Sequence, residues 1–376
     1  MANKNLNNAR AAKKDEFYTQ FRDIEVEMEA YLDYNPDVFR GKTILLPCDD
    51  PEWSNFTRYF AQNFTALGLR KLISTSYAPE SKDYVGAVQL SLFEQESPKY
   101  DADKSRTHGR IFILTEDCAG DGRIDLDGLQ WDYLDGDGDF RSDEVRALRD
   151  EADIIVTNPP FSLFREFLAW IMEAGKQFAI IGNLNGVTYK ETFPLLMNNV
   201  IWMGCTIHSG DRLFGIPDEY PVTAANGYVG EDGKKYIRVK GVRWFTNIEH
   251  GRRHQPLSLM SMDDNVRYSK HKEVNGIGYL HYDNYDAIEV PCTDAIPCDY
   301  EGMMGVPISF LDKYCPEQFE IVGIAKRGAG DPSLKSRVYT KADYPNYSDL
   351  NATPTIKDDA GLLHNTYPRI LIRKRQ

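Results

Sequence analysis

Four consecutive residues, Asn158-Pro159-Pro160-Phe161, carry groups that could prepare an aromatic amine for chemistry. Such an amine is a poor nucleophile because its lone pair is delocalised into the ring. Two hydrogen-bond acceptors on its N–H groups would localise that lone pair. The amide oxygen of Asn158 is one acceptor. The carbonyl of Pro159 is the other, because Pro160 has no N–H with which to continue a turn. The Phe161 ring can stack on a base rotated out of a duplex.

The segments on either side of this tetrapeptide have the patterns of a strand and a helix. Residues 153–157 (Asp-Ile-Ile-Val-Thr) form a short apolar run, typical of a buried strand. Residues 163–174 place apolar side chains on one helical face. The tetrapeptide alone is compatible with a simple turn. In α/β proteins, however, ligands bind where a strand leads into a helix, so the context favours a catalytic role.

The first part of the chain alternates between strand-like and helix-like segments. We expect strands at residues 42–47, 71–77, 110–115, 153–157, 177–181, 200–207 and 236–245. We expect helices at residues 54–67, 142–151 and 163–174. This order predicts an α/β fold with a doubly wound Rossmann-like sheet. From about residue 249 the sequence is rich in Tyr, Asp, Asn, Pro and Gly, and it predicts a smaller irregular lobe.

Several further segments carry a resemblance to a known family. They are Asp15-Glu16-Phe17-Tyr18-Thr19-Gln20, Cys48-Asp49-Asp50-Pro51, Ser54-Asn55-Phe56 and Gly241-Val242-Arg243-Trp244-Phe245-Thr246-Asn247. Together with residues 153–161 they resemble the EcoRI-type adenine-specific DNA methyltransferases, convincingly over residues 15–250 and loosely beyond. The resemblance implies S-adenosyl-L-methionine as cofactor, double-stranded DNA as partner, and a bacterial or phage source.

The resemblance also implies which residues contact the cofactor. Phe17, Tyr18 and Thr19 match a motif that touches the methionine end of S-adenosylmethionine in related enzymes; an amphipathic entry to a first helix explains them as well. Asp139 and Phe140 precede the catalytic strand, where related enzymes place an Asp that accepts the cofactor's adenine amine. A calcium loop is excluded there, because Phe140 stands where such a loop requires Gly.

The segment after the first expected strand departs from methyltransferases in general. Their glycine-rich loop is replaced here by Cys-Asp-Asp-Pro. The resemblance places Asp49, Asp50 and Pro51 in the cofactor loop, where a carboxylate could accept hydrogen bonds from the cofactor. A helix N-cap is the competing role for either aspartate.

Three residues near the end of the last expected strand are candidates for substrate binding. Trp244 or Phe245 could form the second wall of a base pocket, and Arg243 lies among basic residues that suit a DNA-facing edge. Aromatic residues on a strand are also typical of a core, so that alternative stays open.

Charge is unevenly distributed along the chain, whose net charge is −13. Residues 110–153 contain 14 acidic and 5 basic side chains, whereas residues 234–254 contain 7 basic and one acidic. The negative total argues against a protein that simply coats nucleic acid, but a basic C-terminal half is suited to phosphate. We therefore predict a flexible N-terminus (1–14), a catalytic domain (15–248) and a target-recognition region (249–376), helped by the loop 208–235.

Cysteine spacing and apolar run lengths exclude other classes of protein. The six cysteines form no Cys-x-x-Cys pair and match no zinc spacing, so we expect free or buried thiols and no metal. No apolar run approaches the length of a membrane span, and the N-terminus lacks the apolar core of a secretory signal. These features predict a cytoplasmic protein without membrane contact.

The leading hypothesis is transfer of a methyl group to the exocyclic N6 of a flipped adenine in DNA, without a covalent enzyme intermediate. The same motif would suit cytosine N4, an RNA base or a protein glutamine amide. A non-catalytic nucleic-acid-binding protein with a degenerate fold is the alternative of another class. A monomer is expected, and the resemblance allows for a restriction endonuclease acting on the same site without direct binding.

Overall fold

The computed structural model describes residues 18–51, 54–78, 100–115, 131–208, 211–216, 227–230, 233–343, 349–358 and 360–375. Phe17 and the N-terminus predicted to be flexible lie outside these ranges. The chain divides into two compact units, Met1–Asn183 with Gly204–His250, and Leu184–Met203 with Gly251–Gln376. Among the described residues, no helix is long and apolar enough to cross a membrane.

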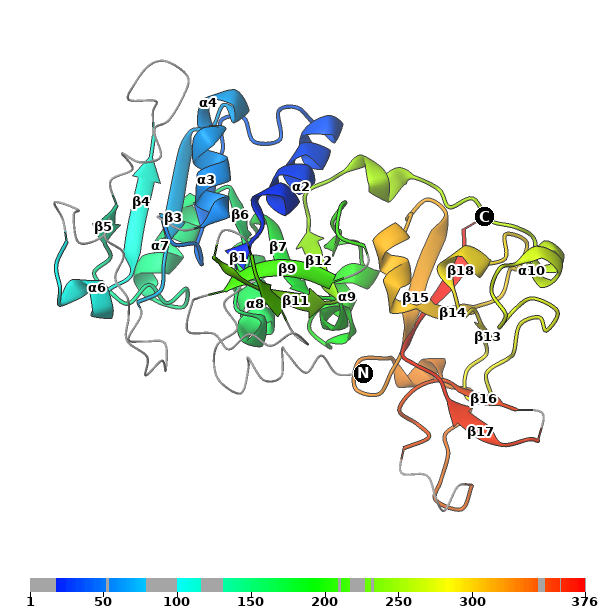
Figure 1. Cartoon of the computed structure of the whole chain (residues 1–376). Helices are drawn as coiled ribbons and strands as arrows, with labels where there is room; N and C mark the ends of the chain where they lie inside the picture. The colour runs from blue at the N-terminus through cyan, green and yellow to red at the C-terminus, as the bar shows by residue number, and fades with distance from the viewer. Residues whose placement is uncertain are drawn as a thin grey trace. The chain divides into compact units, whose positions relative to one another are not determined.

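The main sheet has eight strands in the order β5-β4-β3-β2-β6-β7-β12-β8 (Figure 1). Its strands are β2 (Thr43–Leu46), β3 (Lys71–Thr75), β4 (Arg110–Leu114), β5 (Asp132–Tyr133), β6 (Ile154–Thr157), β7 (Gln177–Asn183), β8 (Trp202–Met203) and β12 (Val242–Thr246). The central strands β3, β2, β6 and β7 are parallel, whereas β4, β5 and β12 pair antiparallel with their neighbours. Every residue of β2, β6 and β12 is buried. The predicted α/β class is confirmed, with a mixed sheet.

Helices connect the strands of the first unit. They are α2 (Phe21–Tyr34), α3 (Asn55–Gln62), α4 (Phe64–Leu67), α6 (Lys104–Thr107), α7 (Asp143–Glu151), α8 (Phe164–Glu173) and the 3-10 turn η3 (Phe161–Leu163). The hydroxyls of Ser54 and Ser142 cap the first turns of α3 and α7. The single helix predicted at 54–67 is divided into two helices, α3 and α4, which meet at Asn63. Gly68, with φ of 63°, ends α4 in the left-handed conformation.

Two strand predictions are wrong in detail. Residues 236–245 are not one strand, because Gly241 adopts φ of 72° and separates β11 (Lys235–Lys240) from β12. β11 instead belongs to an antiparallel sheet in the order β1-β9-β11-β10, with β1 (Tyr18–Thr19), β9 (Asp211–Ile216) and β10 (Gly227–Val229). The strand predicted at 200–207 is only the two-residue β8.

The second unit is more regular than the predicted irregular lobe. Its main sheet has the order β13-β14-β18-β15, and β16 and β17 form a separate hairpin (Figure 1). The strands are β13 (Ile288–Glu289), β14 (Met304–Pro307), β15 (Phe319–Ala325), β16 (Thr355–Lys357), β17 (Leu363–Asn365) and β18 (Arg369–Lys374). The helices and 3-10 turns are η4 (Leu184–Thr188), α9 (Phe193–Met197), η5 (Gly251–His254), α10 (Met262–Tyr268), η6 (Thr293–Ala295), η7 (Ile308–Lys313) and η8 (Pro332–Leu334).

A buried carboxylate ties helix α2 to the segment that follows β8. Glu27 accepts hydrogen bonds from the backbone N–H groups of Cys205 (2.8 Å) and Thr206 (2.9 Å), from the Thr206 hydroxyl, and from the Tyr31 hydroxyl (2.7 Å). We expect Glu27→Ala to lower the free energy of unfolding by about 3 kcal/mol or more, because it leaves several buried donors without an acceptor. Urea denaturation measures this, with the exposed Glu29→Ala on the same helix as control. A loss equal to that of the control would contradict the role.

Candidate active site

The parallel strands bring two sequence-distant segments to one edge of the main sheet. Ile44 and Leu45 of β2 pair with Ile154 and Ile155 of β6, so the two strands end side by side. The loop 47–51 follows β2, and Asn158 follows β6 directly. Because ligands of α/β sheets bind at the carboxyl ends of parallel strands, this edge is the place where the predicted cofactor loop and catalytic motif can cooperate.

A buried aspartate connects these two segments. The carboxylate of Asp49 accepts a hydrogen bond from the Thr157 hydroxyl (2.5 Å) on one oxygen and from the Ser54 hydroxyl (2.6 Å) on the other. Its side chain is only 5% exposed. Asp49 therefore fixes the residue that immediately precedes Asn158. The N-cap of α3 is Ser54, so the alternative that Asp49 or Asp50 caps this helix is wrong.

Burial makes this carboxyl difficult to ionise. It raises the pKa of Asp49 to about 7, although hydrogen bonds from Ser54 and Thr157 oppose the shift and the nearby charge of Asp50 adds to it. The backbone of Asp49 is held as well, since its N–H donates to the Thr75 carbonyl (2.9 Å) and its carbonyl accepts from the Ser74 hydroxyl (2.6 Å). A titratable group held by several hydrogen bonds is thus in direct contact with Thr157, the residue before Asn158.

The tetrapeptide itself forms the start of a tight turn. Asn158 and Pro160 are half-buried and Pro159 is buried. The carbonyl of Pro160 accepts from the Leu163 N–H (2.9 Å), so the turn η3 uses this carbonyl rather than that of Pro159. Phe161 is half-buried and packs against the core of the first unit. The ring is thus supported on one side while part of it stays accessible.

The strand β1 reaches the same region from the N-terminus. The side-chain amide of Asn55, the first residue of α3, donates to the Thr19 carbonyl (2.8 Å). Tyr18 and Thr19 pair with Gly215 and Phe214 of β9. Within the described part of the chain, the Thr19 hydroxyl is buried and has no hydrogen-bond partner. A buried polar atom in this state is costly, which indicates a place where a ligand completes the hydrogen bonding.

Asp50 and Pro51 continue the loop after β2. Asp50 is half-buried, and one of its carboxylate oxygens lies 3.5 Å from Nη1 of Arg110. The Arg110 guanidinium in turn lies over the Trp131 ring, 4.9 Å from its centroid. Pro51 is buried. Of the two aspartates, Asp50 is therefore the one whose carboxylate lies nearer to solvent.

Asp139 and Phe140, the remaining predicted cofactor residues, have different surroundings. The carboxylate of Asp139 accepts hydrogen bonds from the Arg141 guanidinium (2.6 and 2.9 Å), and these bonds lower the pKa of Asp139. The Phe140 ring is buried against Phe167 and Trp170 of α8, with centroids 5.1 and 5.6 Å away. The ring of Phe140 is thus part of the packing of α8, whereas Asp139 keeps an exposed fraction.

The three candidate substrate residues on β12 are all buried. Trp244 packs edge-to-face on Phe56 (5.9 Å between centroids), and Phe245 lies against Phe164 (4.8 Å). The Arg243 guanidinium donates to the carbonyls of Val242 and His208. The structure therefore favours the core role that the sequence left open, over a pocket wall or a phosphate contact.

Sequence reasoning missed the residues that connect the site internally. The sequence placed Thr157 only in an expected strand, and Ser54 and Asn55 only in a segment that resembles the family. Their contacts join residues up to 108 positions apart. One signal was present: polar residues at the ends of apolar runs, such as Thr157, are expected to have a specific hydrogen-bond partner when they are buried.

The fold and the site together define an α/β enzyme class. An Asn-Pro-Pro-Phe turn follows a central parallel strand, and the residue before it is hydrogen-bonded to the loop after β2. This is the arrangement expected of a methyltransferase that acts on a conjugated amine.

Comparisons with known proteins agree with this class. The family model of the adenine-specific methyltransferase EcoRI matches residues 5–375. The chain is 38% identical over 324 residues to the type II methyltransferase M.EcoRI of Escherichia coli, covering 86% of this chain and 90% of that protein. It is 30% identical over 376 residues to the type II methyltransferase M.MpnI of Mycoplasma pneumoniae, covering 99% and 98%. No solved structure gives a significant match. The chain belongs to the EcoRI family of adenine-specific methyltransferases, and it is an adenine-specific DNA methyltransferase.

Proposed function

We propose that this enzyme transfers a methyl group from S-adenosyl-L-methionine to N6 of a specific adenine, which is rotated out of double-stranded DNA. The first unit is the Rossmann-like catalytic domain, and the second unit is the target-recognition region. The position of Asn158-Pro159-Pro160-Phe161 at the carboxyl end of β6, braced by Asp49 through Thr157, carries this proposal. In this assignment the second unit comprises Leu184–Met203 and Gly251–Gln376, whereas the sequence predicted a target-recognition region at 249–376.

The catalytic residues act by positioning. The Asn158 amide oxygen and the Pro159 carbonyl accept hydrogen bonds from the two N–H groups of adenine, so that the nitrogen lone pair points at the methyl donor. Phe161 stacks on the flipped base. Pro160 keeps the backbone in the turn that presents the Pro159 carbonyl. Most of the rate enhancement then comes from alignment of two bound reactants.

The cofactor fits the groups at the edge of the main sheet. When bound, S-adenosylmethionine supplies an electrophilic methyl group on a sulfonium. The buried Thr19 hydroxyl is suited to the polar methionine end, and the Asp50 carboxylate to hydroxyl or amino groups. Asp49 is buried as well as bonded to Ser54 and Thr157, so we assign it a positioning role instead. Asp139 is suited to the cofactor's adenine amine because part of its carboxylate remains exposed beside Arg141.

A Thr19→Val variant tests the cofactor site. We expect the Kd for S-adenosylmethionine to rise about tenfold, because one hydrogen bond to a charged group is lost. The free energy of unfolding without cofactor should stay equal or increase slightly, since Val removes a buried hydroxyl that has no protein partner. Isothermal titration calorimetry and urea denaturation measure the two quantities. Thr57→Val is the control, because that hydroxyl is hydrogen-bonded to Ser74 (2.7 Å). Unchanged affinity in Thr19→Val would contradict the assignment.

An exposed basic face on β11 is suited to DNA phosphates. Along this strand Ile237 and Val239 are buried, whereas Arg238 and Lys240 point to the exposed side. We expect Arg238→Gln or Lys240→Gln each to weaken DNA binding and to reduce the salt dependence of log K by about one unit of slope. Fluorescence anisotropy at several salt concentrations measures this. Arg40→Gln is the matched control, because Arg40 precedes β2 at the opposite, amino end of the parallel strands. Equal slopes in all variants would remove β11 from the DNA interface.

Methyl transfer from labelled S-adenosylmethionine to mixed bacterial DNA tests the function itself. Label in N6-methyladenine is the expected result. Label in N4-methylcytosine, in RNA or in protein glutamine would favour one of the other conjugated amines. Cofactor binding without any transfer would favour a non-catalytic binding protein. Digestion of the methylated DNA with a companion restriction endonuclease would test whether the enzyme protects such a site, and sedimentation would test the proposed monomer.

A further inference from the structure

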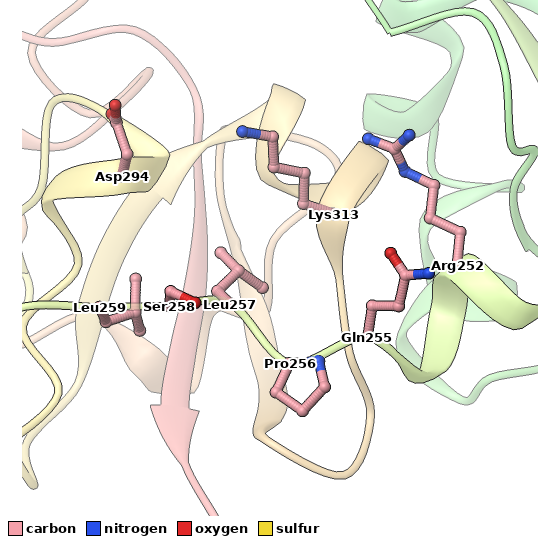
Figure 2. A pocket seen from close by; sticks show the side chains of 8 residues that line it. All are labelled: Arg252, Gln255, Pro256, Leu257, Ser258, Leu259, Asp294 and Lys313. Carbon is pink, nitrogen blue, oxygen red and sulfur yellow. The ribbon is translucent and has the colours of Figure 1, made fainter.

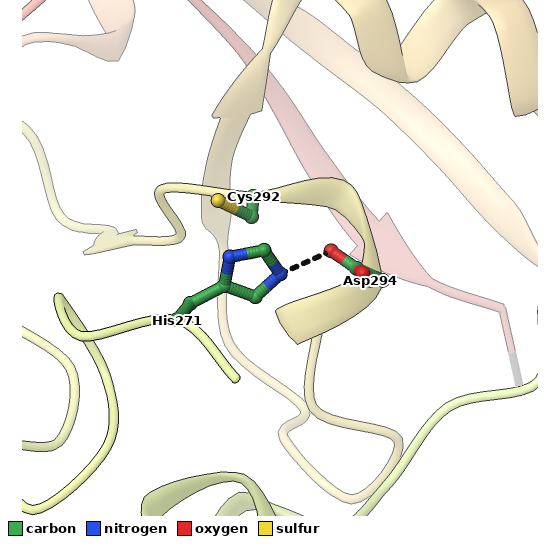
Figure 3. A group of neighbouring side chains, drawn as sticks. All are labelled: His271, Cys292 and Asp294. Carbon is green, nitrogen blue, oxygen red and sulfur yellow. Dashed lines mark hydrogen bonds and ion pairs between the residues drawn. The ribbon is translucent and has the colours of Figure 1, made fainter. Parts of the chain in front are cut away.

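Three side chains with metal-binding atoms meet in the second unit, away from the catalytic motif in sequence. They are His271, Cys292 and Asp294 (Figure 3). One ligand atom from each lies within 4.8 Å of the others. Nε2 of His271 is 2.7 Å from Oδ1 of Asp294. A tetrahedral zinc ion needs ligand atoms roughly 3.4–3.7 Å apart, so only small side-chain movements separate this cluster from a zinc site.

The backbone on both sides of the cluster is held in place. His271 begins a turn in which its carbonyl accepts from the N–H groups of Val274 (3.1 Å) and Asn275 (2.9 Å). Cys292 and Asp294 flank the start of η6, where the Cys292 carbonyl accepts from the Ala295 N–H (3.0 Å). The ligand atoms are thus presented by two ordered turns.

The surroundings supply the outer support that metal sites need. Nζ of Lys270 is 2.7 Å from Oδ2 of Asp294, the oxygen that does not contact His271. This ion pair orients the carboxylate, and a metal ion would replace the hydrogen bond between Oδ1 and Nε2 of His271. Asp294 also lines a cavity of about 290 Å³, with Arg252 and Lys313 among the other lining residues (Figure 2). Its side chain is 44% exposed, so an ion can reach the cluster from solvent.

We propose that His271, Cys292 and Asp294 bind one Zn²⁺ ion, with water as the fourth ligand. A thiolate, an imidazole and a carboxylate form a ligand set that favours zinc over magnesium or calcium, which prefer oxygen ligands alone. Binding releases the thiol proton of Cys292, and His271 binds as a neutral imidazole whose proton is on the ring nitrogen that does not hold the ion. The ion joins the turn at residues 271–275 to η6 and stabilises the second unit. Cysteine spacing gave no sign of this site, because the ligands are up to 23 positions apart in sequence.

Cobalt substitution tests the proposal on the full-length protein. The chain is freed of metal with a chelator and titrated with Co²⁺, whose thiolate complexes give a charge-transfer band in the near ultraviolet. We expect one Co²⁺ per chain, displaced by one Zn²⁺, and a Tm that rises with Zn²⁺ concentration. The absence of a thiolate band in the wild-type protein would overturn the proposal without any variant.

Two variants locate the site. Cys292→Ser should remove the charge-transfer band and weaken zinc binding at least about tenfold. Cys298→Ser is the matched control, because Cys298 is also half-buried in the second unit and lies outside the cluster. Should Cys292→Ser fail to fold, Asp294→Asn keeps the thiolate band but should weaken zinc binding. Equal zinc affinity in Cys292→Ser and Cys298→Ser would place the metal elsewhere and refute the assignment.

Discussion

Asn158→Ala is expected to lower the rate of methyl transfer by about 10³-fold or more while leaving the Kd for S-adenosylmethionine within a factor of about three. The side chain follows β6 directly and is only half-buried, so its loss removes an acceptor for the target amine without opening a large cavity. The proposed cofactor site lies at β1 and the loop after β2, which the substitution does not change. Single-turnover kinetics and calorimetry measure the two effects.

Two further variants sharpen this expectation. Asn158→Asp keeps a side-chain oxygen in the same place and should retain more activity than Asn158→Ala. Asn63→Ala removes an amide of the same unit that bonds only to the Tyr59 carbonyl among the described contacts (2.9 Å), and it should stay close to wild type. Asn158→Ala activity within tenfold of the wild type would refute the proposed role of Asn158.

Local patterns were enough to predict that the Asn158–Phe161 segment lies between a strand and a helix. The strand β6 is a short run buried along its whole length, whereas the helix α8 buries only one face. The tetrapeptide lies between these two patterns. Gly68 directly follows the helix expected at 54–67, and it closes α4 in the left-handed conformation that glycine adopts readily. These features depend on residues that are close together in the sequence, so they can be predicted from the sequence alone.

Features that depend on strand pairing could not be read in this way. The aromatic pair Trp244-Phe245 has the same local pattern whether it lines a pocket or a core. In the structure both rings are buried, Trp244 against Phe56 and Phe245 against Phe164, which favours the core. In the same way, Gly241 gave no local sign that β11 and β12 join different sheets. Their neighbours, β9 and β7, are distant in sequence.

The role of Asp49 was the least predictable part of the site. From the sequence it was a cofactor ligand or a helix cap, because both roles suit an aspartate after a strand. The hydrogen bond to Thr157 spans 108 positions and exists only because β2 and β6 are neighbours. The hydrogen bond to Thr157, a tertiary contact, favours a positioning role for Asp49 over direct contact with the cofactor.

The same contact makes the stability of the enzyme depend on pH. The folded-state pKa of Asp49, about 7, lies above that of an unfolded aspartate, so the folded state holds the proton more tightly. The stabilisation is fully present below about pH 4 and is lost as the pH rises through 7. Between pH 5 and 8 we expect Asp49 to account for a loss of about 2–3 kcal/mol in the free energy of unfolding. The side chain in Asp49→Asn cannot ionise. Between pH 5 and 8 the free energy of unfolding of this variant should therefore fall by about 2–3 kcal/mol less than that of the wild type.

Urea denaturation at several pH values measures the difference between wild type and Asp49→Asn, in which the titrations of all other groups cancel. Thr157→Val supplies an independent check of the cause. The Thr157 hydroxyl stabilises the ionised carboxylate, so its removal should raise the pKa of Asp49 further and move the midpoint of the stability loss to higher pH. Parallel curves for wild type and Asp49→Asn between pH 5 and 8 would mean that Asp49 stays ionised throughout. The Asp49 carboxylate would then be permanently charged and stabilised by the Ser54 and Thr157 hydroxyls. In that case the rate of methyl transfer would not depend on protonation of Asp49.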